Sequence, residues 1–213
     1  TGRPCADFGS GGAVQLGVDA RITTPGDYLV TSPPATFEDV VIVGSAIGDN
    51  RGVELERGIV RGFDARTGAT LWKFDPIPDS PTHPTASQWQ PEQARLTGGA
   101  NAWAPITVDP GRGLAFIPTG SASPDFYGGE RLGTNAMANS LIALDARTGA
   151  VRWFRQLVHH DLWDYDLAAQ PTLVEIDSDT RSIAAVVQAT KSGLLFVLDR
   201  ETGEPVYGIV ARK

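Results

Sequence analysis

The sequence predicts an all-β fold, a β-propeller of four-stranded antiparallel blades, and a repeated turn is the main support for this prediction. The pattern Asp-x-x-Thr-Gly occurs at residues 64–68, 145–149 and 199–203, each time between an apolar run and a second run that contains an aromatic residue. An aspartate that bonds the amides of its own turn, followed by a glycine at positive φ, is typical of a tight hairpin. The three aspartates lie 81 and 54 residues apart, which favours blades of about 40–50 residues with insertions.

Further short apolar runs precede each turn and supply the remaining strands of each blade. They are residues 39–44, 103–108, 113–118, 183–190 and 194–197. The whole chain, residues 1–213, is therefore expected to form part of one propeller domain, with Thr1 and Gly2 as the tail of a further copy of the turn. The blades are expected at about 29–74, 101–157 and 168–211. A β-sandwich is the alternative, but it does not explain the recurring turn.

Three insertions interrupt the repeat, at residues 45–57, 75–100 and 121–138. The second is rich in Pro, Ser and Gln, and we expect an extended surface loop there. Loops of this kind carry binding and catalytic residues in many folds, because a rigid scaffold holds their ends. We therefore expect the insertions to run over one face and to contribute to a site.

Composition excludes several classes of partner. The chain has 213 residues and a net charge of −7, and its three lysines are Lys73, Lys191 and Lys213. Nucleic-acid binding requires clustered cations, so no nucleic-acid partner is expected. No run approaches the roughly 18 consecutive apolar residues of a membrane-spanning helix. Cys5 is the single cysteine, so no disulfide is expected within this chain.

The most unusual stretch is residues 158–166, Val-His-His-Asp-Leu-Trp-Asp-Tyr-Asp. It fits neither the helical nor the strand period, which indicates an irregular loop. A carboxylate beside an indole ring is partly desolvated, and desolvation raises its pKa and makes it a better proton acceptor. The alternative is a structural corner in which Asp161 and Asp164 accept hydrogen bonds from the amides of the loop.

Three other places could take part in chemistry. Trp103 follows a glycine pair and offers a flat surface for a planar ligand, although a single Trp at the start of a strand is often a core residue. Residues 118–125 form a polar turn after a strand. Lys191 lies between two apolar strands, and a buried lysine requires an anionic partner.

Taken together and in order, these segments resemble the quinoprotein dehydrogenases that use pyrroloquinoline quinone (PQQ). The resemblance is greatest to the membrane-bound glucose dehydrogenase branch, with the quinate/shikimate dehydrogenases nearby. The segments that carry it are residues 62–72, 101–105, 118–125, 158–166, 170–171 and 191–200. It implies an eight-bladed propeller, of which this chain would form about half, with the cofactor and a Ca²⁺ (or Mg²⁺) near the axis.

The resemblance also implies roles for individual residues. Asp164 corresponds to the catalytic base, Trp103 to the residue that stacks on the cofactor, and Lys191 to the cation at the quinone oxygens; Asn101 is assigned to the cofactor site as well. The implied reaction is oxidation of a hydroxyl group on a sugar or polyol, with hydride to the quinone and electrons onward to membrane ubiquinone. The implied location is the periplasmic face of the bacterial inner membrane. A cation beside a quinone oxygen favours this chemistry, because it stabilises the developing negative charge.

The metal ligands implied by the resemblance are less well matched. Ca²⁺ prefers oxygen ligands, so His159 and His160 are expected to shape their loop instead of binding metal. Ser121 stands where related alcohol dehydrogenases have Asn, and Asp125 is a second candidate there. The metal glutamate is assigned to Glu54, with Asp49 and Glu56 as rivals. The alternative to an enzyme is a non-catalytic propeller that binds a protein partner, which the repeated turns would suit equally well.

Overall fold

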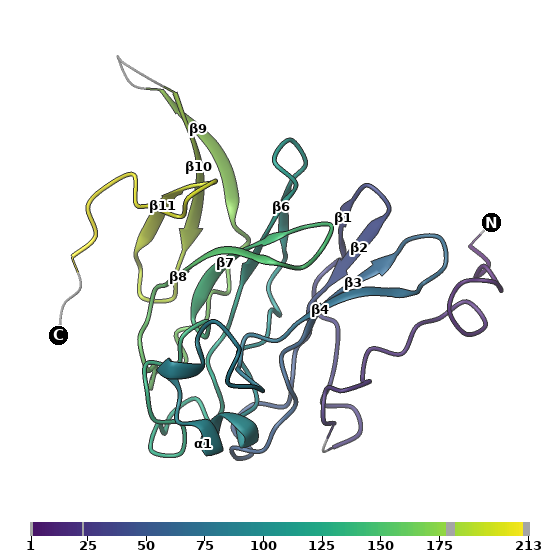
Figure 1. The fold of residues 1–213 in the computed structure, drawn as a ribbon, viewed down its shortest axis with the longest axis horizontal. Helices are drawn as coiled ribbons and strands as arrows, with labels where there is room; N and C mark the ends of the chain where they lie inside the picture. Colours follow the sequence, from purple (N-terminus) through teal and green to yellow (C-terminus); the bar gives the residue numbers. More distant parts are fainter. Residues whose placement is uncertain (1, 23, 178–181, 211–213) are drawn as a thin grey trace.

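A computed structural model describes residues 2–22, 24–177 and 182–210. Three antiparallel sheets lie side by side like neighbouring blades, with the short helix α1 below them (Figure 1). The strand orders are β1-β2-β3-β4, β5-β6-β7-β8 and β9-β10-β11. Their bounds are β1 Ala35–Phe37, β2 Val40–Val43, β3 Val60–Asp64, β4 Thr70–Phe74, β5 Thr107–Asp109, β6 Leu114–Pro118, β7 Ser140–Asp145, β8 Val151–Gln156, β9 Thr172–Asp177, β10 Ser182–Ala189 and β11 Leu195–Asp199. The prediction of four-stranded antiparallel sheets is confirmed for the first two.

The predicted turns are also confirmed. Asp64 Oδ1 accepts hydrogen bonds from the backbone N–H of Arg66 at 3.0 Å and of Thr67 at 2.7 Å. Gly68 follows at a φ of 72°. The copies that begin at Asp145 and Asp199 repeat these bonds. Each turn therefore satisfies its own backbone donors and reverses the chain within five residues.

Tryptophan rings join neighbouring sheets by packing on the turn glycine of the next copy. A Cβ atom at Gly149 would lie 2.6 Å from two carbons of the Trp72 ring, and one at Gly203 would lie 2.6 Å from the Trp153 ring. The Trp153 indole N–H also donates to Arg200 O at 2.9 Å. Only glycine allows so close an approach, so these contacts fix how one sheet sits against the next.

The middle sheet is buried on both faces. Side chains alternate along β6, so Ala115 and Ile117 pack toward the first sheet while Leu114 and Phe116 pack toward the third. All five residues of β6 are buried. A strand enclosed in this way reads as a continuous apolar run, which is how residues 113–118 appear in the sequence.

The prediction of an extended surface loop at residues 75–100 is wrong. It contains the 3₁₀ helix η1 Ala86–Gln88 and the helix α1 Pro91–Leu96. Gln90 caps α1 by accepting a hydrogen bond from Gln93 N at 2.9 Å. Apolar residues of the segment 75–100 form a small separate core with alanines from the neighbouring segment. The members of this core are Ile77, Trp89, Ala94, Ala100, Ala122 and Ala138.

Two other expectations need correction. Residues 103–106 do not belong to β5, which begins at Thr107; Pro105 has no N–H for a sheet ladder. The third sheet has three described strands, and the chain after the last turn makes only an isolated bridge between Leu198 and Pro205. Thr1, residues 178–181 and residue 211, which the predicted repeats include, lie outside the described part of the chain.

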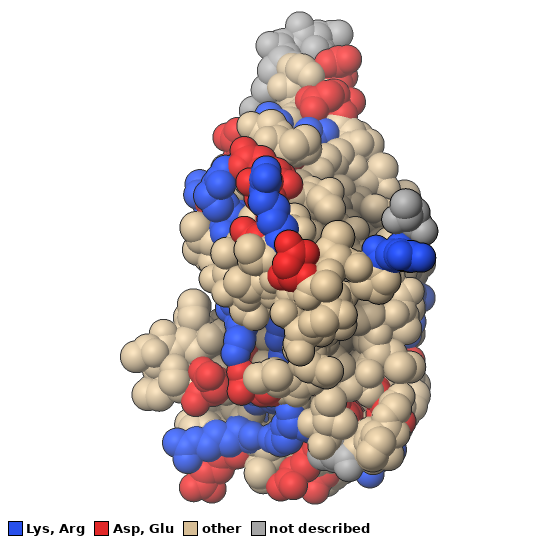
Figure 2. All heavy atoms as spheres, turned by 90° about the vertical axis from the view of Figure 1, so that its right-hand side faces the viewer, with Lys and Arg blue, Asp and Glu red and all other residues tan. Residues whose placement is uncertain are grey.

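Charged side chains of both signs are mixed on the surface. On the face shown in Figure 2, Lys and Arg side chains lie among Asp and Glu side chains and form no broad patch of one sign. In the part of the chain that the structure describes, no helix has the length and apolar character needed to cross a membrane.

Candidate functional site

Trp103, Asp164 and Lys191, which are far apart in the sequence, meet at one place. The Lys191 ammonium donates to Asp164 Oδ2 at 3.1 Å and to Asp164 O at 2.8 Å. The same Nζ lies 5.9 Å from the centroid of the Trp103 ring. The structure therefore brings together the three residues that the sequence assigned to one site. Their chemical roles stay predictions.

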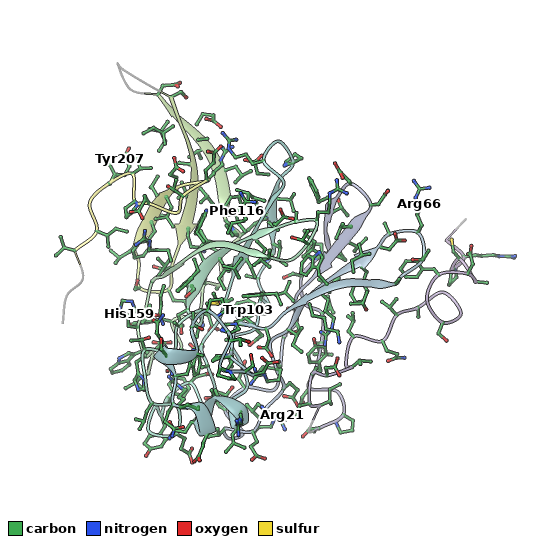
Figure 3. All side chains as sticks on the ribbon, in the orientation of Figure 1. Arg21, Arg66, Trp103, Phe116, His159 and Tyr207 are labelled. Atoms are coloured by element: carbon green, nitrogen blue, oxygen red, sulfur yellow. The ribbon has the colours of Figure 1, made fainter. Side chains whose placement is uncertain are left out.

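Each of the three comes from a loop outside the sheets. Trp103 precedes β5, and its backbone oxygen accepts hydrogen bonds from the hydroxyl groups of Thr31, at 3.0 Å, and Ser32. Asp164 lies in the loop between β8 and β9, and Lys191 in the turn between β10 and β11. Figure 3 shows Trp103 near the middle of the molecule and His159, at the start of the Asp164 loop, toward the edge.

Asp166 is a fourth member of the site, and the sequence analysis assigns it no separate role. Its Oδ1 accepts from Ser121 N at 2.6 Å, while its Oδ2 accepts from the Trp103 indole N–H at 3.1 Å and from Lys191 Nζ at 3.2 Å. The only signal in the sequence was the alternation of Asp and aromatic residues at the end of the 158–166 loop. That alternation does not reveal which donors each carboxylate meets.

The structural alternative for the loop holds for Asp161 but not for Asp164. Asp161 is buried and accepts hydrogen bonds from Trp163 N at 3.1 Å and Tyr165 N at 2.7 Å. His160 fastens the loop as well, with its Nδ1 atom 2.7 Å from Gly133 O. Asp164, by contrast, adopts a φ of 57° and contacts the lysine. One aspartate therefore builds the loop and the other faces the site.

The carboxylates of the site disfavour one another's charge. Partial burial raises the pKa of Asp164, the negative charge of Asp166 raises it further, and Lys191 opposes both. Burial, with the charges of Asp49, Asp166 and Asp164, raises the pKa of Asp125 to about 7. Asp49 is exposed when the whole residue is considered. Its carboxylate is nevertheless partly desolvated, and this desolvation, together with the charges of Asp166 and Asp164, raises its pKa to about 6. These shifts indicate an acidic site in which Lys191 is a nearby cation.

Of the metal candidates, the structure brings Asp125 to this acidic site and places Glu54 elsewhere. Glu54 lines a cavity of about 720 Å³ together with Gln93 and Leu96, and it acts on the pKa of Arg21. For Asp49, weighed as a rival, desolvation raises the pKa and the charges of Asp166 and Asp164 add to this effect, so its carboxylate interacts with the acidic site. The loop 45–57 carries three acidic residues, and its path, which depends on tertiary contacts, decides which of them faces the site.

The remaining candidates have structural partners. The Ser121 hydroxyl donates to Asp161 Oδ2 at 2.6 Å, so its hydrogen is already used. Asn101 is buried and its side-chain amide donates to Ser45 O at 2.9 Å. The rival Glu56 is fully buried and pairs with Arg51 at 3.0 Å. Across residues 2–22, 24–177 and 182–210, no three His, Cys, Asp or Glu side chains lie close enough together to form a metal site by themselves.

The residues present fit a flat anionic cofactor and a cation. The Trp103 ring, partly exposed and with an ammonium group near it, offers a flat surface beside a positive charge. A planar molecule with carboxylate or quinone oxygens would satisfy both features. Burial raises the pKa values of Asp49 and Asp125, and repulsion from neighbouring carboxylates raises them further; a divalent cation would offset that repulsion.

Comparison with known proteins gives a consistent result. Residues 1–213 match the family model described as PQQ, glucose/ethanol/alcohol dehydrogenase, β-propeller domain. The chain is 37% identical to the quinoprotein glucose dehydrogenase of Escherichia coli over 206 residues, which are 96% of this chain and 25% of that protein. It is 38% identical to the quinate/shikimate dehydrogenase (quinone) of Acinetobacter baylyi over 214 residues, 99% of this chain and 26% of that protein.

The fold comparison confirms the predicted propeller. The structure of the quinohemoprotein alcohol dehydrogenase from Comamonas testosteroni superposes with a TM-score of 0.75 at 28% identity, covering 86% of this chain and 29% of that one. The chain thus spans about a quarter of the length of the curated relatives it matches.

Proposed function

Because the chain belongs to the PQQ-dependent family of glucose, ethanol and alcohol dehydrogenases with a β-propeller domain, we propose that it contributes the catalytic base and part of the cofactor site to an enzyme that oxidises a hydroxyl group of a sugar or cyclic polyol. The observation that carries this proposal is the convergence of Trp103, Asp164 and Lys191, with the ammonium 3.1 Å from the carboxylate and 5.9 Å from the ring centroid. A scaffold that only binds a protein partner has no use for this arrangement.

The proposed roles follow from the chemistry of each side chain. PQQ, when bound, supplies the two-electron acceptor for the oxidation. The Trp103 ring provides a flat surface for it, and the Lys191 ammonium provides a positive charge for its oxygens. The Asp164 carboxylate accepts the proton of the substrate hydroxyl, and it can release that proton to solvent because its side chain is 36% exposed. Asp125 and Asp49 would hold the Ca²⁺ or Mg²⁺.

The names of the relatives support a polyhydroxylated substrate. They include glucose and quinate/shikimate dehydrogenases and the glycerol dehydrogenase large subunit of Gluconobacter thailandicus, to which the chain is 35% identical. We further propose a membrane quinone as the electron acceptor, which the word quinone in the Acinetobacter name supports. The resemblance to the membrane-bound branch supports the periplasmic face of the bacterial inner membrane as the location.

The test is an exchange of Asp164 for asparagine in the full-length protein. After reconstitution with PQQ and Ca²⁺, dye reduction is measured with glucose, quinate, glycerol and ethanol. We expect Asp164→Asn to lower turnover by at least about 100-fold, as the loss of a general base does, while PQQ still binds. The control is Asp39→Asn, the same change at a side chain that is 68% exposed. Turnover in Asp164→Asn close to that of the control would refute the assignment.

A further inference from the structure

Asp166 is surrounded by hydrogen-bond donors from three separate segments. Its side chain is 12% exposed, and it accepts from the backbone N–H of Ser121, the indole N–H of Trp103 and the ammonium of Lys191. The donors belong to the turn after β6, the segment before β5 and the turn between β10 and β11. A single buried carboxylate therefore ties together parts of the second and third sheets.

The backbone around Asp166 is shaped to admit this carboxylate. A Cβ atom at Gly120 would lie 2.7 Å from Asp166 Oδ1, so a side chain there would displace the carboxylate. On the other side, Leu167 is 1% exposed and lies in the core between the second and third sheets. Packing thus holds the backbone next to Asp166 while the glycine leaves room for its oxygens.

The two bonds to Trp103 and Lys191 determine geometry that neither residue could hold by itself. An indole has one N–H, so a hydrogen bond to it restricts rotation of the ring and fixes the plane of its face. A lysine ammonium on a flexible four-carbon chain takes many positions unless acceptors hold it. Bonds between an ionised acceptor and these donors are the strong kind. The same Oδ2 atom receives both bonds, so the ring plane and the ammonium position are coupled.

Asp166 is also placed differently from the proposed base. Its Oδ1 and Oδ2 together receive three hydrogen bonds, whereas the Asp164 side chain contacts the Lys191 ammonium and the carboxyl group of Asp166. The Asp164 side chain is three times as exposed, 36% against 12%. A carboxylate whose oxygens already accept from fixed donors is poorly placed to take a substrate proton.

From this arrangement we propose that Asp166 is a positioning residue, which sets the plane of the Trp103 ring and the place of the Lys191 ammonium together and so prepares the surface that binds the cofactor. The inference rests on the proposed function, because it assumes that this surface binds PQQ. Asp166 acts through the other two residues and takes no proton from the substrate.

The experiment measures PQQ binding to the full-length apo-protein, by quenching of tryptophan fluorescence, for Asp166→Asn and Asp166→Ala. Loss of charge-assisted bonds should raise the dissociation constant by between about tenfold and 100-fold in Asp166→Asn and by more in Asp166→Ala. At saturating PQQ, Asp166→Asn should still turn over at a reduced rate, unlike Asp164→Asn. The control is Asp109→Asn, which removes another buried carboxylate, 4% exposed and paired with Arg200, and should leave the dissociation constant unchanged.

A double-mutant cycle tests whether Asp166 acts through the indole. Trp103→Phe keeps an aromatic ring but removes the N–H, so the effects of Trp103→Phe and Asp166→Asn on PQQ affinity should be clearly less than additive. Additive effects, or an Asp166→Asn protein that binds PQQ within about twofold of the parent, would overturn the inference. Equal weakening in Asp109→Asn would also overturn it, since the effect would then be one of stability. Failure of the unaltered protein to bind PQQ would instead refute the proposed function.

Discussion

The contact between Trp72 and Gly149 gives a measurable prediction about how the sheets are held together. Gly149 lies at a φ of 72°, and a Cβ there would lie 2.6 Å from ring carbons of Trp72. In Gly149→Ala the left-handed backbone costs about 1–2 kcal/mol, and displacement of a packed ring costs about 1–3 kcal/mol. The alanine also restricts the unfolded chain, which offsets about 0.4–1 kcal/mol. The net loss of stability should be about 1–5 kcal/mol.

A second glycine separates the two contributions. Gly193 lies at a φ of 77° in the turn between β10 and β11, and no atom lies within 4 Å of a Cβ built there. Gly193→Ala therefore reports backbone strain without a clash. Both variants are made in the full-length protein, and their free energies of unfolding are compared by urea denaturation. If Gly149→Ala is no less stable than Gly193→Ala, the ring contact does not join the sheets as described.

Three further predictions concern charge. Asp109→Asn removes the buried partner of Arg200 at 3.2 Å and leaves it the more exposed Glu175 at 3.0 Å, so it should destabilise the protein by about 1.5–3 kcal/mol, measured by urea denaturation; no loss would show that the other bonds of Arg200 suffice. Because the pKa of Asp164 is raised, the rate of cofactor reduction should increase with pH, with the midpoint of the increase above 3.8. Lys191→Met removes a cation that lowers this pKa, so it should move the midpoint higher; a lower midpoint would contradict the geometry. Burial raises the pKa of Asp125 to about 7, so the metal-free protein should gain up to about 4 kcal/mol of stability as the pH falls from 8 to below 4, and Asp125→Asn should remove most of that gain.

The turns could be predicted from the sequence because their chemistry is local. Asp64, Thr67 and Gly68 bond within five residues, so the pattern itself specifies the structure. The convergence of Trp103, Asp164 and Lys191 was predicted only through the family resemblance. No local pattern in the sequence indicates that the 158–166 loop and the turn at Lys191 meet.

What could not be predicted depends on packing between segments. The helix α1 has only six residues, too few for a clear helical period, and it is stabilised by a small core that forms only when the chain is folded. In the loop 45–57, Asp49, Glu54 and Glu56 are chemically similar, and tertiary contacts decide which of them interacts with the carboxylates of the site. The role of Asp166 depends on three donors from distant segments, which the sequence does not place.

The two tryptophan contacts allow a final test, because only one of them lies between the sheets that supply the site. Asp164 follows β8 of the second sheet and Lys191 lies in the turn between two strands of the third, and Trp153 on Gly203 joins these two sheets. Trp72 on Gly149 joins the first sheet to the second. Gly203 and Gly149 have φ values of 70° and 72° and the same 2.6 Å clash, so the two alanine variants should lose similar stability.

Their effects on the cofactor should differ. A shift of the third sheet moves the Lys191 ammonium away from Asp164 and from the Trp103 ring, and a displacement of about 1 Å is enough to impair such a site severely. Gly203→Ala should therefore weaken PQQ binding by about tenfold or more, measured by fluorescence quenching below the unfolding transition, while Gly149→Ala should change it much less. Equal effects of the two variants would mean that blade packing does not control the distance between lysine and carboxylate, and that local bonds such as those of Asp166 hold the site by themselves.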